Sequence, residues 1–168
     1  MDKINLDFQA IQDKSRAFGS GVWYPNCYYF SGFPMHRLFM IKPYLAVSRS
    51  TRKGRGVFTR ANIPTKTVIE ISPVIVLSGK DTDRADKTIL HNYIFLWGAR
   101  LTRTCIALGY CSIYNHSFDP NCEYEMDFSV DTMTIKTLRG ISKGEELTIN
   151  YNGETTDQTP LWFKVKKS

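Results

Sequence analysis

The chain has 168 residues, of which 42% are hydrophobic and 23% are charged, so it is long enough to bury a core and has an ordinary globular composition. No stretch reaches the roughly 18 apolar residues that a membrane helix needs, and the N-terminus lacks the apolar region of a signal peptide. We therefore expect an intracellular protein without a membrane segment, located in the cytoplasm or in the nucleus or nucleoid.

The formal net charge is +6, but the charges are unevenly distributed along the chain. Basic residues cluster around a Gly-rich turn between residues 49 and 60, whereas residues 119–131 hold five Asp and Glu and no Lys or Arg. A basic β-domain that binds nucleic acid is one hypothesis. The acidic block disfavours phosphate backbones and favours a lysine-bearing protein partner, so we expect nucleic acid to be contacted only indirectly.

The four cysteines, at positions 27, 105, 111 and 122, show no closely paired spacing. A disulfide framework or a zinc site normally shows tighter clustering. We expect free and mostly buried thiols, a reducing compartment, and no metal site.

Residues 1–42 form an N-terminal extension that is rich in aromatic residues. Ile4, Phe8, Ile11 and Phe18 lie near helical spacing, which predicts a short amphipathic helix before several Gly and Pro residues interrupt the pattern. The extension could fold back to bury its rings, or it could bind a partner or stay partly disordered. The sequence leaves these alternatives open.

From Pro43 onward the pattern is typical of short strands separated by Gly, Pro and Asn. Pro73 splits one β-branched run into two strands or bends a single strand, and residues 81–92 favour a helical turn or two. The predicted strands are 44–47, 56–59, 67–71, 74–77, 93–97, 105–108, 123–128, 133–138 and 146–149. Together they predict a mostly β fold of several small sheets with little helix.

The first motif with chemical content is the turn from Lys53 to Phe58, where Gly54 and Gly56 flank Arg55. Glycines spaced in this way let a backbone approach a ligand closely and expose its N–H and C=O groups. The turn fails the dinucleotide-binding and Walker A patterns. Taken alone, it is a weak signal, more typical of a tight turn between strands than of a ligand site.

Two further motifs follow in the second half of the chain. Asn115, His116 and Ser117, with Pro120–Asn121 just after, concentrate donors and acceptors in one loop that could saturate a polar ligand or simply form a structural turn. His116 with Cys111 and Cys122 lacks the fourth ligand of a zinc site. Tyr151 ends the strand 146–149 and could direct its phenol into a pocket.

In this order, over residues 43–152, the three motifs resemble a SET domain, the fold of protein-lysine methyltransferases. The segment 61–69 is similar to a step of that family in which a glycine usually stands at the position of Lys66. Residues 108–114 are similar to compact viral and bacterial members. The resemblance implies a β-clip of small sheets, with a C-terminal pseudoknot that brings the Asn115 loop beside Tyr151. It divides the chain into an extension at 1–42, the domain at 43–152 and a closing tail at 153–168.

The resemblance also implies methyl transfer from S-adenosylmethionine to the side-chain amine of a protein lysine, and a histone or histone-like protein is a compatible substrate. Tyr151 is the expected catalytic residue, and Tyr124 and Tyr93 would line the lysine channel. The residues expected to bind the cofactor are Lys53, Gly54, Arg55, Gly56, Asn115, His116, Tyr151 and Trp162.

No cysteine follows Cys122, so the tail would close the site through Trp162 without zinc. The alternative is a catalytically silent SET-fold module that binds protein partners, and a homodimer is compatible with either function.

Overall fold

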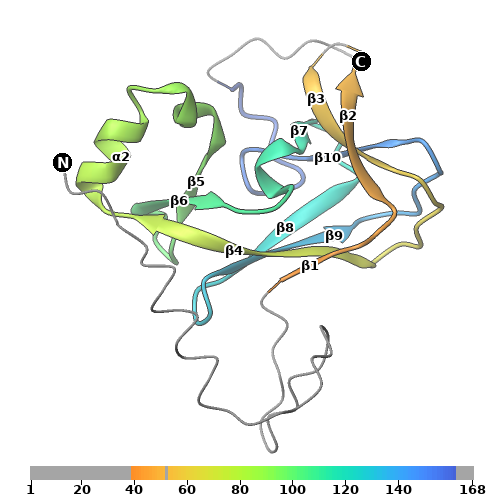
Figure 1. Ribbon diagram of the computed structural model, residues 1–168, viewed down its shortest axis with the longest axis horizontal. Coiled ribbons are helices and arrows are strands. Elements are labelled where there is room, and N and C mark those ends of the chain that lie inside the picture. The colour runs from red at the N-terminus through yellow and green to blue at the C-terminus, as the bar shows by residue number, and fades with distance from the viewer. Residues whose placement is uncertain (1–38, 52, 162–168) are drawn as a thin grey trace, which may run out of the picture. The chain divides into compact units, whose positions relative to one another are not determined.

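The computed structural model describes residues 39–51 and 53–161, which form two β-sheets and a few short helices (Figure 1). The predicted helix within residues 1–42 and the predicted tail residue Trp162 lie outside the described residues. The mostly β fold predicted from the sequence is confirmed. In Figure 1, β2 and β3 curve along one side of the domain, and α2 lies at the opposite side.

The larger sheet has the strand order β5-β6-β4-β9-β8, with β1 added beside β4, and all of its pairings are antiparallel. Its strands are β1 (Met40–Ile41), β4 (Val68–Leu77), β5 (Ile94–Trp97), β6 (Arg103–Ala107), β8 (Cys122–Asp127) and β9 (Thr132–Thr137). Residues 40 and 41, which the sequence places in the extension, pair with Ile71 and Glu70 of β4.

Of the two possibilities left open at Pro73, the structure has one continuous strand, β4. Pro73 lies between the part of β4 that pairs with β1 and the part that pairs with β6. Its carbonyl accepts the N–H of Leu108 at 3.0 Å. The N–H and C=O of one strand residue point to the same side, so the position without an N–H faces the place where β1 ends and β6 begins. A proline is tolerated there because no ladder hydrogen bond is lost.

The smaller sheet has the order β2-β3-β10-β7, and its strands are β2 (Leu45–Ser50), β3 (Gly54–Thr59), β7 (Asn115–His116) and β10 (Glu146–Ile149). β7 and β10 run parallel, with Thr148 opposite Asn115 and Ile149 opposite His116. Residues 115 and 116, expected as a loop, are therefore a short strand beside the end of β10. This pairing brings the Asn115 motif next to Tyr151; the threading of a pseudoknot stays a prediction.

The hydrophobic core draws fully buried side chains from both sheets, including Val57 and Leu147 from the smaller and Ile69 and Ile135 from the larger. Each such side chain contributes about 1.5–3 kcal/mol when it leaves water. Cys105, Cys111 and Cys122 are buried free thiols, as predicted, and Cys27 lies outside the described residues.

The described helices are short: α2 (Gly79–Ala85) and the 3-10 helices η1 (Ile89–Tyr93) and η2 (Cys111–Ile113). α2 begins after Ser78, whose hydroxyl accepts the N–H of Asp81 at 3.2 Å as an N-cap. The helical turns predicted for residues 81–92 are thereby confirmed. No described helix has the length and hydropathy needed to cross a membrane.

Candidate active site

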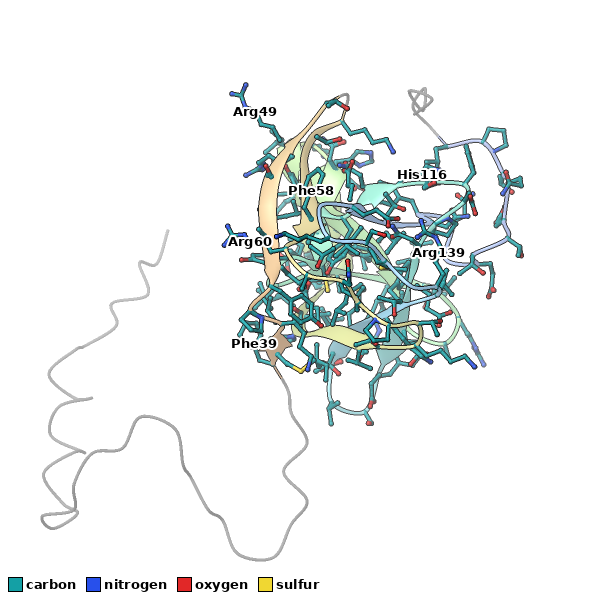
Figure 2. All side chains as sticks on the ribbon, turned by 90° about the vertical axis from the view of Figure 1, so that its right-hand side faces the viewer. Phe39, Arg49, Phe58, Arg60, His116 and Arg139 are labelled. Atoms are coloured by element: carbon teal, nitrogen blue, oxygen red, sulfur yellow. The ribbon has the colours of Figure 1, made fainter. Side chains whose placement is uncertain are left out.

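Two cavities adjoin each other where the smaller sheet meets η1 and η2. The first, here called the basic cavity, has a volume of about 650 Å³ and carries the cations of the β2–β3 turn. Its lining residues are Arg49, Ser50, Lys53, Gly54, Arg55, Asn92, Tyr93, Ser112, Ile113, Asn115 and Tyr151. Figure 2 shows the Arg49 side chain projecting outward from β2.

The two glycines of the β2–β3 turn have different structural roles. Gly54 lines the basic cavity with a φ of +80°, and no atom lies within 4 Å of the position that a Cβ would take. Gly56 does not line the cavity. A Cβ there would overlap Glu146 Oε1 and come within 2.8 Å of Asn115 Nδ2. Gly54 therefore leaves backbone open to a ligand, whereas Gly56 leaves room for the Glu146–Asn115 pair.

Hydrogen bonds fix the orientation of the Asn115 amide. Its Nδ2 donates to the carbonyl of Arg55 at 2.9 Å and to Glu146 Oε1 at 2.6 Å, which uses both of its hydrogens. The hydroxyl of Ser50 donates to the other Glu146 oxygen at 2.9 Å and holds that carboxylate in place. Asn115 lines the basic cavity, and because both amide hydrogens are used within this network, its amide oxygen is the side-chain atom that remains as an acceptor for a ligand.

His116 lies beside the cavities and lines neither of them. Its carbonyl accepts Lys53 Nζ at 2.9 Å, and its ring Nδ1 accepts the backbone N–H of Tyr151 at 3.2 Å. Burial, with Lys53 nearby, lowers the pKa of His116 and so favours the neutral ring, and the hydrogen bond from the Tyr151 N–H assigns Nδ1 as the unprotonated nitrogen. Its buried Nε2 has no hydrogen-bond partner among the described residues. His116 therefore holds the Lys53 side chain and the Tyr151 backbone in place by hydrogen bonds, without lining either cavity.

The second cavity, here called the aromatic cavity, has a volume of about 620 Å³. Its walls include Tyr93, Tyr124 and Tyr151, which come from three separate segments of the chain. Phe95 packs edge-on against Tyr124, with 5.7 Å between the ring centroids. The remaining lining residues are Asn92, Ile94, Leu96, Leu101, Cys111, Ser112, Tyr114, Met126, Asn152, Gly153, Glu154, Asp157, Thr159, Pro160 and Leu161.

The phenols of Tyr151 and Tyr124 stay protonated at neutral pH. Burial, together with Tyr93 and Glu146, raises the pKa of Tyr151 to about 12. Burial also raises the pKa of Tyr124 to about 12, with smaller contributions from Cys105 and Glu154. The Tyr151 hydroxyl donates to the carbonyl of Tyr114 at 2.8 Å. Both phenols can therefore orient a ligand by hydrogen bonding, and neither is a general base at neutral pH.

The two cavities carry opposite charge. Arg49, Lys53 and Arg55 line the basic cavity, whereas Glu154 and Asp157 are the acidic side chains that line the aromatic cavity within the described part of the chain. An anionic group on a ligand is favoured in the first cavity and a cationic group in the second.

The acidic block detected in the sequence does not form the wall of the aromatic cavity. Along β8, Tyr124 and Met126 line the cavity, and alternation places Glu123 and Glu125 on the opposite face. There Lys136 Nζ lies 3.9 Å from Glu123 and 3.6 Å from Glu125. The carboxylates at the cavity come from residues 154 and 157, after Tyr151.

Of the residues predicted for the site, Lys53, Gly54, Arg55, Asn115 and Tyr151 line the basic cavity. Tyr124 lines the aromatic cavity, Tyr93 and Tyr151 line both, Gly56 and His116 lie behind the walls, and Trp162 lies outside the described residues. Asn92, Ser112 and Tyr114 were missed, because nothing in their local sequence separates them from ordinary turn and strand residues.

Comparison with known proteins gives one consistent set of relatives. Residues 54–152 match the model of the SET domain. The chain is 35% identical over 133 residues to the H3 lysine-37 specific histone-lysine N-methyltransferase of Schizosaccharomyces pombe, covering 79% of this chain and 85% of that protein. It is 28% identical over 142 residues to the histone-lysine N-methyltransferase SETD7 of Halocynthia roretzi, covering 72% of this chain and 36% of the relative.

A solved structure also resembles the domain. The crystal structure of a candidate histone methyltransferase of Plasmodium falciparum superposes with a TM-score of 0.53 at 26% sequence identity. The match covers 66% of this chain and 95% of that one.

Proposed function

The chain belongs to the SET-domain family, and from this premise we propose that it is a histone-lysine N-methyltransferase whose adjoining cavities hold the methyl donor and the substrate lysine. S-adenosylmethionine supplies the methyl group when bound, and the reaction produces a methylated lysine side chain. The curated relatives named as histone-lysine N-methyltransferases support the substrate class. A histone substrate would place the enzyme in the nucleus or nucleoid.

The residues of the basic cavity fit S-adenosylmethionine, which carries a carboxylate and an ammonium group on its amino-acid end. Lys53 and Arg55 supply positive charge for the carboxylate, and Asn115 supplies an acceptor for an N–H donor. Gly54 leaves its backbone uncovered at the cavity wall. The carboxylate of Glu146 fixes Asn115 in the orientation that makes this acceptor available.

The aromatic cavity fits a lysine side chain. Its tyrosine rings can pack along an aliphatic stem, and Glu154 and Asp157 favour a cationic peptide at the cavity. The amine must lose its proton to react, which costs roughly 4 kcal/mol at pH 7.4 from a reference pKa of about 10.4. Burial among the rings lowers that cost because desolvation disfavours the charged amine.

Tyr151 orients the amine in this proposal. Its hydrogen is directed to the carbonyl of Tyr114, so its oxygen faces a substrate amine as an acceptor for an N–H group. Because its pKa is about 12, it does so as a neutral phenol. Fixing the nitrogen in line for transfer can supply on the order of 7–11 kcal/mol of the barrier. Tyr93 and Tyr124 complete the channel wall.

One observation carries the proposal: Tyr93, Tyr124 and Tyr151 converge from three segments on the region where the basic cavity and the aromatic cavity adjoin. The test uses the full chain with tritiated S-adenosylmethionine and a panel of recombinant core histones, with the modified residue located by mass spectrometry. We expect labelled lysine with the wild type and about a 100-fold loss in Tyr151→Phe, because the amine is no longer held in position.

Binding of S-adenosylhomocysteine, measured by calorimetry, separates the possible outcomes. Retained binding in Tyr151→Phe together with lost transfer supports the assigned role. Binding by the wild type without transfer to any histone would instead indicate a silent SET-fold module. No binding at all would contradict the cofactor assignment.

A further inference from the structure

Glu70 is a fully buried carboxyl group that the proposed reaction does not use. It lies on β4, in the larger sheet, and lines neither cavity. An isolated carboxylate in such a place is costly unless hydrogen bonds surround it. Its partners therefore indicate why the fold retains it.

Four neutral donors surround Glu70. Oε1 accepts the Ser72 hydroxyl at 2.7 Å and the backbone N–H groups of Tyr110 and Cys111 at 2.7 and 3.0 Å. Oε2 accepts the Tyr114 hydroxyl at 3.0 Å. Three of these four bonds come from residues 110–114, here called the partition segment. The carboxyl group therefore binds that segment at both of its ends.

Gly109, just before the partition segment, shows how close this packing is. It has a φ of +77°, and a Cβ there would overlap the Ser72 hydroxyl and come within 2.7 Å of Glu70 Oε1. The backbone thus enters the segment directly against the carboxyl group, in a conformation that favours glycine.

The partition segment forms part of both cavity walls. Ser112 lines both cavities, Ile113 lines the basic cavity, and Cys111 and Tyr114 line the aromatic cavity. The carbonyl of Tyr114 also accepts the hydroxyl of Tyr151 at 2.8 Å. A chain of contacts therefore runs from the buried Glu70, through the side chain and then the carbonyl of Tyr114, to the phenol at the reaction centre.

We propose that Glu70 is a positioning residue for the methyl transfer: it holds Tyr114 so that the Tyr114 carbonyl fixes the hydroxyl of Tyr151. This inference rests on the proposed function, and it concerns how the phenol is aimed. Glu70 itself touches neither cavity and acts through Tyr114.

Two matched variants test the proposal without altering Glu70. Tyr114→Phe and Ser72→Ala each remove one buried hydroxyl donor from the same carboxyl group, but only Tyr114 belongs to the partition segment. If Glu70 is purely structural, both variants should lower stability and change kcat to a similar extent. Positioning predicts a kcat at least 10-fold lower in Tyr114→Phe and within 2-fold of wild type in Ser72→Ala, with KM for S-adenosylmethionine within 3-fold in both.

A spectroscopic readout keeps the test independent of the histone substrate. In protein labelled with ¹³Cζ-tyrosine, the Tyr151 signal, assigned by its loss in Tyr151→Phe, reports the hydrogen bond of that phenol. It should shift in Tyr114→Phe and stay in place in Ser72→Ala. Glu70→Gln should repeat the Tyr114→Phe pattern, and it serves as the second variant if Tyr114→Phe does not fold.

Equal effects of Tyr114→Phe and Ser72→Ala on kcat and on the Tyr151 signal would overturn the proposal. An unmoved signal in both variants would overturn it as well. Failure of the wild type to methylate any histone would count against the proposed function alone, because the signal of Tyr151 still decides whether Glu70 positions the phenol.

Discussion

Replacing Gly56 by alanine should damage the cofactor side of the site, although Gly56 lines neither cavity. The new methyl group would occupy the place of Glu146 Oε1 and approach Asn115 Nδ2. Gly56 does not have a positive φ, so alanine meets no backbone strain there. The effect should come from displacing the Glu146 carboxylate and, to a smaller extent, the Asn115 amide.

The magnitude follows from the hydrogen bonds that the displaced carboxylate loses. Glu146 can rotate away from the methyl group, but it then gives up the donors from Asn115 at 2.6 Å and Ser50 at 2.9 Å. A hydrogen bond to a charged group contributes about 1.5–3 kcal/mol, and partial exposure reduces this, so we expect about 2–4 kcal/mol in all. Part should appear as lower unfolding free energy and part as weaker S-adenosylhomocysteine binding, by roughly 10-fold or about 1.4 kcal/mol.

The assays are urea unfolding and calorimetry on four proteins: wild type, Gly56→Ala, Glu146→Ala and the double variant. Once Glu146 is shortened, the added methyl group has only the Asn115 amide left to displace, so its cost should fall below its cost in the wild type. Gly140→Ala is the matched control, since the nearest atom to its Cβ is the Ile63 carbonyl at 4.0 Å. Additive costs in the double variant, or a wild-type affinity in Gly56→Ala, would refute this reasoning.

Three further predictions concern single side chains. Asn121→Ala should lower the unfolding free energy in urea by about 2–4 kcal/mol, because this buried side chain bonds Glu145, the Glu146 carbonyl and the Thr148 N–H; a loss under 1 kcal/mol would contradict it. The pKa of His116 is lowered in the folded protein, so on acidification the unfolded chain is protonated at a higher pH than the folded one. The free energy of unfolding should therefore fall as the pH drops below about 6.5. His116→Gln should show a shallower fall between pH 7.5 and 5.5, and an unchanged dependence of the unfolding free energy on pH would count against the assignment. Since the pKa of Tyr151 is about 12, initial rates between pH 7 and 10 should show no loss from its ionisation, and a decline absent from the thermal stability over that range would argue otherwise.

Much of the fold could be predicted because short β-branched runs and Gly, Pro and Asn turns are local signals. The strand at Asn115–His116 could not, because its pairing with β10 depends on residues more than 30 positions away. Among the site residues, the Gly54 turn, Asn115 and Tyr151 carried motifs. Ser112 and Tyr114 carried none, since they reach the cavities only through a turn that Glu70 holds from another strand.

Lys66 shows how a departure from the family pattern gains a physical meaning. The resemblance places a glycine at this position, and the structure gives Lys66 a φ of +56°. A side chain in the left-handed region costs roughly 1–2 kcal/mol relative to the right-handed one. Lys66 thus occupies a backbone conformation that suits glycine better, which the sequence alone shows only as a departure from the family pattern.

Asn92, Tyr93, Ser112 and Tyr151 belong to the walls of both cavities, so under the proposed function the two binding equilibria would depend on each other. A ligand that orders these four side chains in one cavity loses their conformational entropy on binding. A second ligand that then binds in the other cavity loses less. Linkage then requires reciprocity: whatever factor S-adenosylhomocysteine applies to the affinity for a histone peptide, the peptide must apply to S-adenosylhomocysteine. The same factor would therefore describe how each product changes the affinity of the protein for the other.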